Sequence, residues 1–148
     1  MADIFKIARA ISKIKPAQLV SNVVSRSDIR KLIIDLNTKD QLLEHNENAF
    51  GIKLYAIGGS YSPSYAKSKG SKPKDIDLNK SGRYYRTFKV TALSNGNARI
   101  TSNNKIHGSD TFLAQERWGE VEGLNAENTA IVHKAIQEEI IKYISSLS

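Results

Sequence analysis

The sequence predicts an α+β fold with N-terminal helices, a small antiparallel β-sheet with a hairpin in the middle, and a C-terminal amphipathic helix. Hydrophobic residues recur every three or four positions near both ends, which is typical of helices with one buried face. Between them, strand-like runs flank the hairpin signal Asn95-Gly96-Asn97. Helical and strand segments do not alternate, so a parallel sheet built from βαβ units is not expected. The 148 residues fit a single domain, with residues 1–26 as a helical extension and 27–148 as the core.

Three helical segments are expected in the first third of the chain. Residues 2–15 form an amphipathic pattern, whose apolar positions are Ile4, Ile7, Ala8, Ile11 and Ile14. Pro16 should end that helix and open a short one over residues 17–24, because proline disfavours helical geometry before it and suits a first turn. Ser27 or Asp28 is the expected cap of a long third helix over residues 27–46.

The middle of the chain predicts strands and turns. Residues 52–57 form a strand-like run that Gly58-Gly59 closes, and Ser62-Pro63 should cap and start a single helical turn. Residues 67–76 are expected to be a loop, and residues 79–82 a turn. Residues 84–92 and 98–102 are the expected strands of the hairpin.

The last third returns to helical spacing. Residues 112–118 predict a short helix that ends at Gly119, and Asn125 is the expected cap of the final helix. The buried stripe of that helix should consist of Ile131, Val132, Ala135, Ile136, Ile140, Ile144 and Leu147, with Glu138, Glu139 and Lys142 on its wet side.

Composition excludes several classes of protein. The chain has no cysteine, which removes disulfides, thiolate nucleophiles and cysteine-ligated zinc, and makes an intracellular origin the default expectation. Charges interrupt the first sixteen residues, and no run approaches the ~18 apolar residues of a membrane span. We therefore expect neither a secretory signal peptide nor a transmembrane segment.

No motif for catalysis or for binding a metal or cofactor stands out. The three histidines, His45, His107 and His133, lack neighbouring ligands at metal-binding spacing, and we interpret them as solvated or packing residues. The chain has no nucleophile elbow, phosphate-binding loop or dinucleotide fingerprint. We therefore predict that the protein is not an enzyme and has no cofactor.

The net charge of +7 is concentrated in the middle of the chain. Residues 66–105 hold ten basic and two acidic side chains, whereas residues 106–148 hold three basic and seven acidic ones. A molecule with oppositely charged ends can attract other copies of itself as readily as it attracts a polyanion. The candidate contact residues for protein or DNA are Lys67, Lys69, Lys72, Lys74, Lys80, Arg83 and Arg86.

Two interpretations of this basic segment remain open. Lysines and arginines beside Tyr84 and Tyr85 could neutralise phosphates and stack on bases, as in a nucleic-acid-binding module. Alternatively, the segment is a solvated loop next to core aromatics, which could order against an acidic neighbouring subunit. The helix over residues 2–15 has a similar choice between a membrane surface and packing on protein, and we favour packing.

An ordered set of short motifs resembles the virion morphogenesis, or tail-completion, family of tailed phages, particularly those of Bacteroides-type hosts. It comprises Leu36–Leu42, then Gly51, Leu54 and Tyr61-Ser62, then Tyr65, Ala66, Lys67, Lys69 and Gly70, then Asp77–Val90, then Trp118-Gly119 and Gly123–Asn125 before the last helix. The resemblance runs from about Ile33 to the C-terminus. The chain departs from the family in its more basic lysine-rich loop and in Ser81, where threonine is commoner before glycine.

The resemblance implies a structural virion protein of the head–tail neck or connector region. Members of this family form closed rings of identical subunits that join portal or connector proteins to tail or collar proteins, and they carry no catalytic residues. The expected location is the neck or tail of the virion, and the host cytoplasm during assembly. Non-specific contact with DNA in the channel is a further expectation, and contact with a membrane is not expected.

Overall fold

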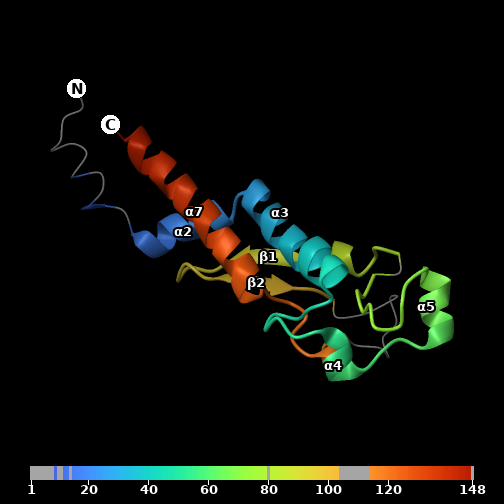
Figure 1. Ribbon diagram of the computed structural model, residues 1–148. Helices are drawn as coiled ribbons and strands as arrows, with labels where there is room; N and C mark the ends of the chain where they lie inside the picture. Colours follow the sequence, from blue (N-terminus) through green and yellow to red (C-terminus); the bar gives the residue numbers. More distant parts are fainter. Residues whose placement is uncertain (1–8, 10–11, 14, 80, 104–113, 148) are drawn as a thin grey trace.

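A computed structural model describes residues 9, 12–13, 15–79, 81–103 and 114–147 of the chain. The fold is α+β, as predicted, with one two-stranded antiparallel sheet and a long C-terminal helix (Figure 1). Its elements are α2 (Pro16–Val24), α3 (Ser27–Asp35), the π-helix η1 (Leu36–Glu44), α4 (Leu54–Gly58), α5 (Pro63–Lys69), the 3-10 helix η2 (Tyr85–Thr87), β1 (Lys89–Ala92), β2 (Ala98–Thr101), α6 (Ala114–Trp118) and α7 (Ala126–Ser146).

The expected helix over residues 2–15 lies almost wholly outside the described residues. Pro16 opens α2 at its first position, as predicted. The cap predicted for the next helix is wrong, because Arg26 precedes α3 and makes no side-chain capping bond. Asp28 instead lies in the first turn and pairs with Arg26 at 2.8 Å, where a carboxylate also complements the helix dipole.

The long helix predicted over residues 27–46 is present but changes its hydrogen-bond pattern at Leu36. Residues 36–44 form a π-helix, in which Asn37, Thr38 and Gln41 are buried. The hydroxyl of Thr38 donates to the carbonyl of Ile34 at 2.7 Å, a side-chain bond that competes with the α-helical ladder. The spacing of apolar residues could not predict this π-helix, because the contacts of the π-helix are made largely by its polar side chains.

The strand predicted over residues 52–57 is wrong. The chain instead forms the short helix α4. Just before this helix, Lys53 pairs with Glu47 in an isolated antiparallel β-bridge. A short apolar run fits either a strand or a helix, and the choice depends on what it can pack against. Leu54 is fully buried, and Gly58 lies against Arg117 and Trp118 of α6. Packing of α4 on α6 therefore replaces strand pairing.

The predicted hairpin is confirmed. β1 and β2 pair antiparallel from Lys89–Thr101 to Ala92–Ala98, and Gly96 takes a positive φ of 87° in the connecting turn. The strand expected over residues 84–92 begins later than predicted, because residues 85–87 form the 3-10 helix η2. The predicted starts of α5, where Ser62 accepts from the Tyr65 amide at 3.2 Å, and of α7, where Asn125 is the cap, are correct. Helix α5 is longer than the predicted single turn and continues to Lys69, so the loop expected over residues 67–76 begins only after that residue.

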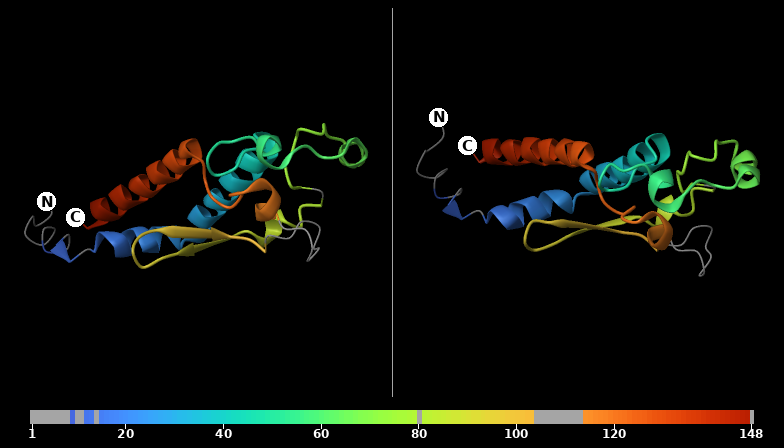
Figure 2. Two further views of the ribbon diagram at one scale, coloured as in Figure 1. Left: turned by 90° about the horizontal axis from the view of Figure 1, so that it is seen from below. Right: turned by 60° about the horizontal axis from the view of Figure 1, so that its bottom comes forward.

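Two hydrophobic clusters form the core. One joins Trp118, Leu42, Leu54 and neighbouring aromatics at the end of the molecule that holds α4 and α5. The other joins α2, α3, β1 and α7 through Val24, Ile33, Val90 and Val132. Helices α2 and α3 both contact α7 and the hairpin, whereas the C-terminal end of α7 lies at the opposite end of the molecule from α5 (Figure 2). Residues 16–24 are thus packed into the core rather than separate from it.

Candidate functional site

The predicted basic contact residues are distributed over three elements. Lys67 and Lys69 belong to α5, Lys72 and Lys74 to the loop after it, and Arg86 to η2. Arg83 is exposed in the turn before η2, and Lys80 lies outside the described residues. Lys67, Lys72, Lys74, Arg83 and Arg86 are exposed.

Lys69 differs from the other basic residues because its side chain is buried. Its ammonium forms an ion pair with Asp77 and donates to the backbone carbonyl of Asn79 at 3.0 Å. The same ammonium lies 5.0 Å from the ring centre of Tyr61 and 5.8 Å from that of Tyr65. Only 3% of the Lys69 side chain is exposed, so its charge holds the loop in place and is not offered to a partner.

Two further contacts hold the chain around Asp77. The amide of Leu78 donates to the hydroxyl of Tyr61 at 3.0 Å, and the hydroxyl of Tyr85 donates to the carbonyl of Asp77. Leu78 is 1% exposed and has a φ of 58°, a conformation that is costly for a branched side chain. The lysine-rich segment is therefore anchored at its far end and is not the wholly solvated loop that its composition suggested.

The aromatic residues of this segment face inwards. Tyr84 is 3% exposed, accepts from the Ser102 hydroxyl at 3.2 Å and meets Phe88 edge to face. Burial raises the pKa of Tyr84 to about 12, and burial likewise raises the pKa of Tyr61, Tyr65 and Tyr85. Tyr84 therefore has no free face for stacking on a base, which removes it as a candidate for binding nucleic acid in that way.

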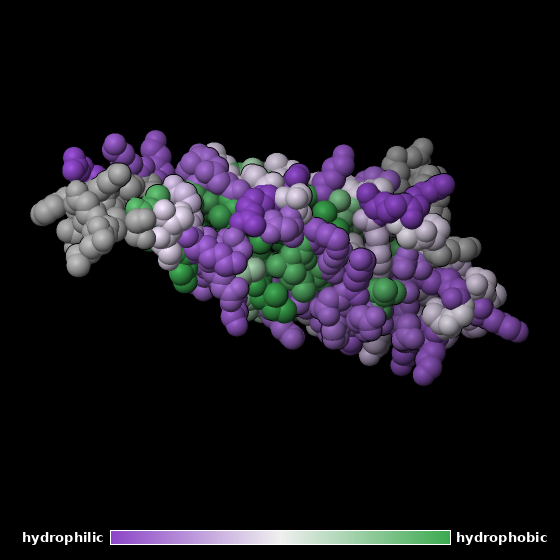
Figure 3. All heavy atoms as spheres, turned by 90° about the horizontal axis from the view of Figure 1, so that it is seen from above, coloured by the Kyte–Doolittle hydropathy of each residue, from purple (hydrophilic) through white to green (hydrophobic). Residues whose placement is uncertain are grey.

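Hydrophobic side chains reach the surface close to the basic segment. Four lie within eight residues: Phe50 is 73% exposed, Ile52 47%, Ile57 43% and Tyr55 39%. We call Phe50, Ile52, Tyr55 and Ile57 the apolar turn. The ammonium of Lys74 lies 5.2 Å from the ring centre of Tyr55, so the basic loop borders this turn. The face of the molecule in Figure 3 also has a hydrophobic patch among hydrophilic residues.

Local hydrogen bonds fix the shape of the turn that carries Phe50. The Asn48 side-chain oxygen accepts from the amides of Phe50 at 2.9 Å and Ile52 at 3.0 Å. The Ala49 amide donates to the carbonyl of Glu120 at 2.8 Å, and Gly51 has a φ of 74°. Asn48 is only 2% exposed. The exposed Phe50 is therefore carried by a hydrogen-bonded turn, so ordering of the backbone adds little to the entropic cost of binding there.

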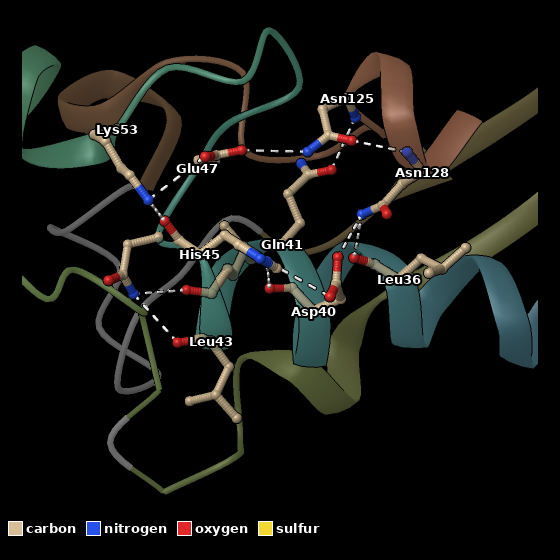
Figure 4. A network of polar contacts seen from close by, with 11 residues as sticks. Leu36, Asp40, Gln41, Leu43, His45, Glu47, Lys53, Asn125 and Asn128 are labelled. Atoms are coloured by element: carbon tan, nitrogen blue, oxygen red, sulfur yellow. Dashed lines mark hydrogen bonds and ion pairs between the residues drawn. The ribbon is translucent and has the colours of Figure 1, made fainter. Parts of the chain in front are cut away.

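A network of buried amides joins this turn to two helices (Figure 4). Gln41 donates to the Gly123 carbonyl at 2.7 Å and accepts from the Asn125 amide at 2.8 Å. Asn125 caps α7 through the Asn128 amide at 2.9 Å, and its own side-chain amide donates to Glu47 at 3.3 Å. Glu47 in turn pairs with Lys53 at 3.5 Å across the turn.

The remaining contacts of this network come from the π-helix. Asn37 donates to the Val121 carbonyl at 2.9 Å and accepts from the Gly123 amide at 2.8 Å. The Asn128 side chain donates to Asp40 at 3.0 Å. Each of the buried amides of this network therefore has hydrogen-bond partners, as is usual for buried polar groups. The π-helix, the entry to α7 and the apolar turn consequently form one connected unit.

The histidines are not gathered at a site. His45 ends the π-helix, with its Nδ1 3.0 Å from the Asp40 carbonyl; His133 is exposed on α7; His107 lies outside the described residues. Within the described ranges, no three acidic or histidine side chains are arranged to hold a metal ion. Nor do those ranges include a helix long and apolar enough to cross a membrane.

Neither a protein-family model, a curated protein nor a solved structure matches this chain. The candidate site therefore rests on the residues themselves. Sequence patterns missed the apolar turn because residues 52–57 predict a strand. The turn signal Asn48-Ala49-Phe50-Gly51 was available, with an asparagine that can bind the backbone two residues on. The buried amides of Asn37 and Gln41 gave no sequence signal, since their partners lie more than 80 positions away.

Proposed function

We propose that this chain is a structural subunit of the head–tail neck of a tailed phage. In this proposal, copies of the chain assemble into a ring that joins portal or connector proteins to tail or collar proteins. The ordered motifs between Ile33 and the C-terminus are the reason for choosing this class of assembly. The proposed place of action is the virion neck, with assembly in the host cytoplasm.

The observation that carries the proposal is the exposure of Phe50 on a hydrogen-bonded turn. Interfaces derive most of their binding energy from a few aromatic and apolar anchors, surrounded by a polar rim. The apolar turn supplies such anchors, and Lys74 beside Tyr55 supplies part of a basic rim. The acidic C-terminal third of a neighbouring copy, with seven acidic residues in positions 106–148, complements that rim. Contacts between unlike surfaces close into a ring when the rotation between copies closes.

Light scattering after size-exclusion chromatography tests the proposal on the full chain. We expect an oligomer for the unaltered chain and a shift towards the monomer for Phe50→Ser combined with Ile52→Ser. Ile131→Ser is the matched control, because Ile131 is a 43% exposed isoleucine of α7 outside the apolar turn. A chain that stays monomeric with and without portal or tail proteins would contradict the proposal, and so would equal effects of the turn and control variants.

Non-specific binding of DNA is the second candidate, because five exposed basic residues lie close together in the sequence. This role predicts that affinity falls steeply with salt, by a power of the salt concentration that grows with the number of phosphates contacted. Lys67→Ser, Lys72→Ser and Lys74→Ser together should then weaken binding and flatten the salt dependence. If these substitutions leave DNA retention unchanged while Phe50→Ser abolishes assembly, protein docking is the role of this surface.

A further inference from the structure

A second apolar surface lies at the other end of the molecule. An open groove of about 840 Å³ lies between α2, the hairpin and α7, and its apolar lining includes Val20, Val24, Ile100, Leu124 and Ile136. The apolar surface continues past this groove along the last two turns of α7. There Ile141 is 62% exposed, Tyr143 44% and Ile144 36%. Two of the seven positions predicted to form the buried stripe of this helix, Ile131 and Ile144, are therefore exposed to solvent.

The described residues just before α2, and its first turn, lie beside this surface. Ala17, in the first turn of α2, lies against the hairpin tip: a Cβ built on Gly96 would be 3.3 Å from the Ala17 Cα. Lys13 and Lys15 line a second groove together with Glu139 and Tyr143 of α7. Lys13 and Lys15, which precede α2, therefore lie close to the exposed end of α7.

The sequence of residues 2–15 is complementary to what it would meet there. Ile4, Ile7, Ile11 and Ile14 recur at helical spacing, with Lys6, Arg9 and Lys13 between them. Glu138 on α7 carries the opposite charge, whereas Glu139 already pairs with Arg26 at 2.5 Å and with Lys142 at 3.3 Å. A 14-residue helix would be ~21 Å long, enough to cover the last two turns of α7 and the mouth of the groove. Lys15 has an extended backbone, with φ −91° and ψ 115°, so the chain can change direction before α2.

We infer that residues 2–15 of the same chain dock as an amphipathic helix on the exposed end of α7 and the adjoining mouth of the groove. The same chain is favoured over a second copy because Lys13 and Tyr143 already line the same groove. A linker this short gives the segment a high effective concentration at the surface. This inference does not depend on the proposed role in a phage neck, since it concerns how the subunit covers its own apolar surface.

Disulfide trapping tests the inference directly, because the chain has no cysteine of its own. Ile144→Cys is combined with Ile4→Cys, Ile7→Cys or Ile11→Cys, and the full chain is oxidised gently at low concentration. We expect an intrachain disulfide in at least one pair. Arg9→Cys with Ile144→Cys is the matched control, because Arg9 lies on the opposite side of the helical pattern and should cross-link much more slowly.

Mixing single-cysteine chains separates the two possible occupants. Chains with Ile7→Cys and chains with Ile144→Cys should form few mixed dimers. Efficient mixed dimers would show that a second copy fills the surface and would overturn the inference, as would equal trapping of the Arg9 control.

Hydrogen exchange supplies a readout without cysteines. Replacing Ile4, Ile7 and Ile11 together by serine should speed exchange at residues 140–147 by about tenfold or more, because three apolar side chains would lose their buried contacts. Replacing Lys6, Arg9 and Lys13 by serine should change exchange less. Unchanged exchange in the isoleucine variant would overturn the inference.

Discussion

Lys69 and Asp77 form an ion pair that is almost closed off from solvent, with 3% of one side chain and 14% of the other exposed. Removing one member of a buried pair leaves an uncompensated charge, which typically costs about 3–5 kcal/mol. We expect Lys69→Met to lower the free energy of unfolding by this amount in urea titrations. Lys67→Met, an exposed lysine of the same helix, should change it by less than ~0.5 kcal/mol.

A double variant separates the energy of the ion pair from that of the other contacts of Lys69 and Asp77. The double variant Lys69→Met, Asp77→Asn should lose less stability than the sum of the two single variants, since the coupling between the charges is counted twice in that sum. Equal costs for Lys69→Met and Lys67→Met would contradict the closed ion pair.

Gly58 is fixed by the approach of α6 to α4. A Cβ at this position would lie 2.3 Å from the Arg117 carbonyl oxygen and 2.6 Å from the Trp118 ring. Gly58→Ala should therefore destabilise the fold by about 1–3 kcal/mol, despite the better helix propensity of alanine. It should also shift the fluorescence of Trp118, the one tryptophan of the chain.

Gly70→Ala is the control for this prediction. Gly70 has a φ of 71° but no atom within 4 Å of a built Cβ, so this variant reports backbone strain without a clash. It should leave Trp118 fluorescence unchanged. A Gly58→Ala protein as stable as the unaltered chain would mean that α4 and α6 do not pack as described.

Asn125 has two separable roles, capping α7 and holding Glu47. Asn125→Ala removes both and should cost about 0.5–2 kcal/mol, the range for a lost cap. Asn125→Ser keeps an oxygen for the Asn128 amide and should recover most of that stability. Because serine cannot reach Glu47 in the same way, hydrogen exchange in residues 47–53 should rise in both variants; equal stability losses in the two would argue against the cap.

The buried tyrosines predict a loss of stability in alkali. Burial raises the pKa of Tyr84 to about 12, above the ordinary value near 10. The unfolded chain therefore loses this proton first, and stability is full below pH 10 and falls as the pH rises towards 12. Two units of pKa correspond to on the order of 3 kcal/mol.

Tyr84→Phe should accordingly lose about 0.5–1.5 kcal/mol at neutral pH, where the Ser102 bond is missing, yet show a shallower alkaline decline. Urea titrations at several alkaline pH values measure both effects. Tyr143→Phe, at an exposed position, controls for the removal of one hydroxyl. An unchanged alkaline slope in Tyr84→Phe would contradict the burial of this ring.

Local chemistry was readable from the sequence wherever a residue acts on its immediate neighbours. Pro16 at the start of α2, Ser62-Pro63 at α5, Asn95-Gly96 in the hairpin and Asn125 before α7 all lie where their types predict. Caps and turns depend on hydrogen bonds between groups a few residues apart, so the types of neighbouring residues are enough to predict them.

Tertiary structure decided what depends on distant partners. Ile57 lies in helix α4, and Ile52 just before it, because α6 packs on α4. Lys69 is buried because Asp77 and two tyrosine rings enclose it. Residues 36–44 form a π-helix that bonds to the chain at residues 121–128. Charge and hydropathy are properties of a residue, but exposure is a property of its surroundings, so the sequence determined which groups exist and the fold decided which of them face a partner.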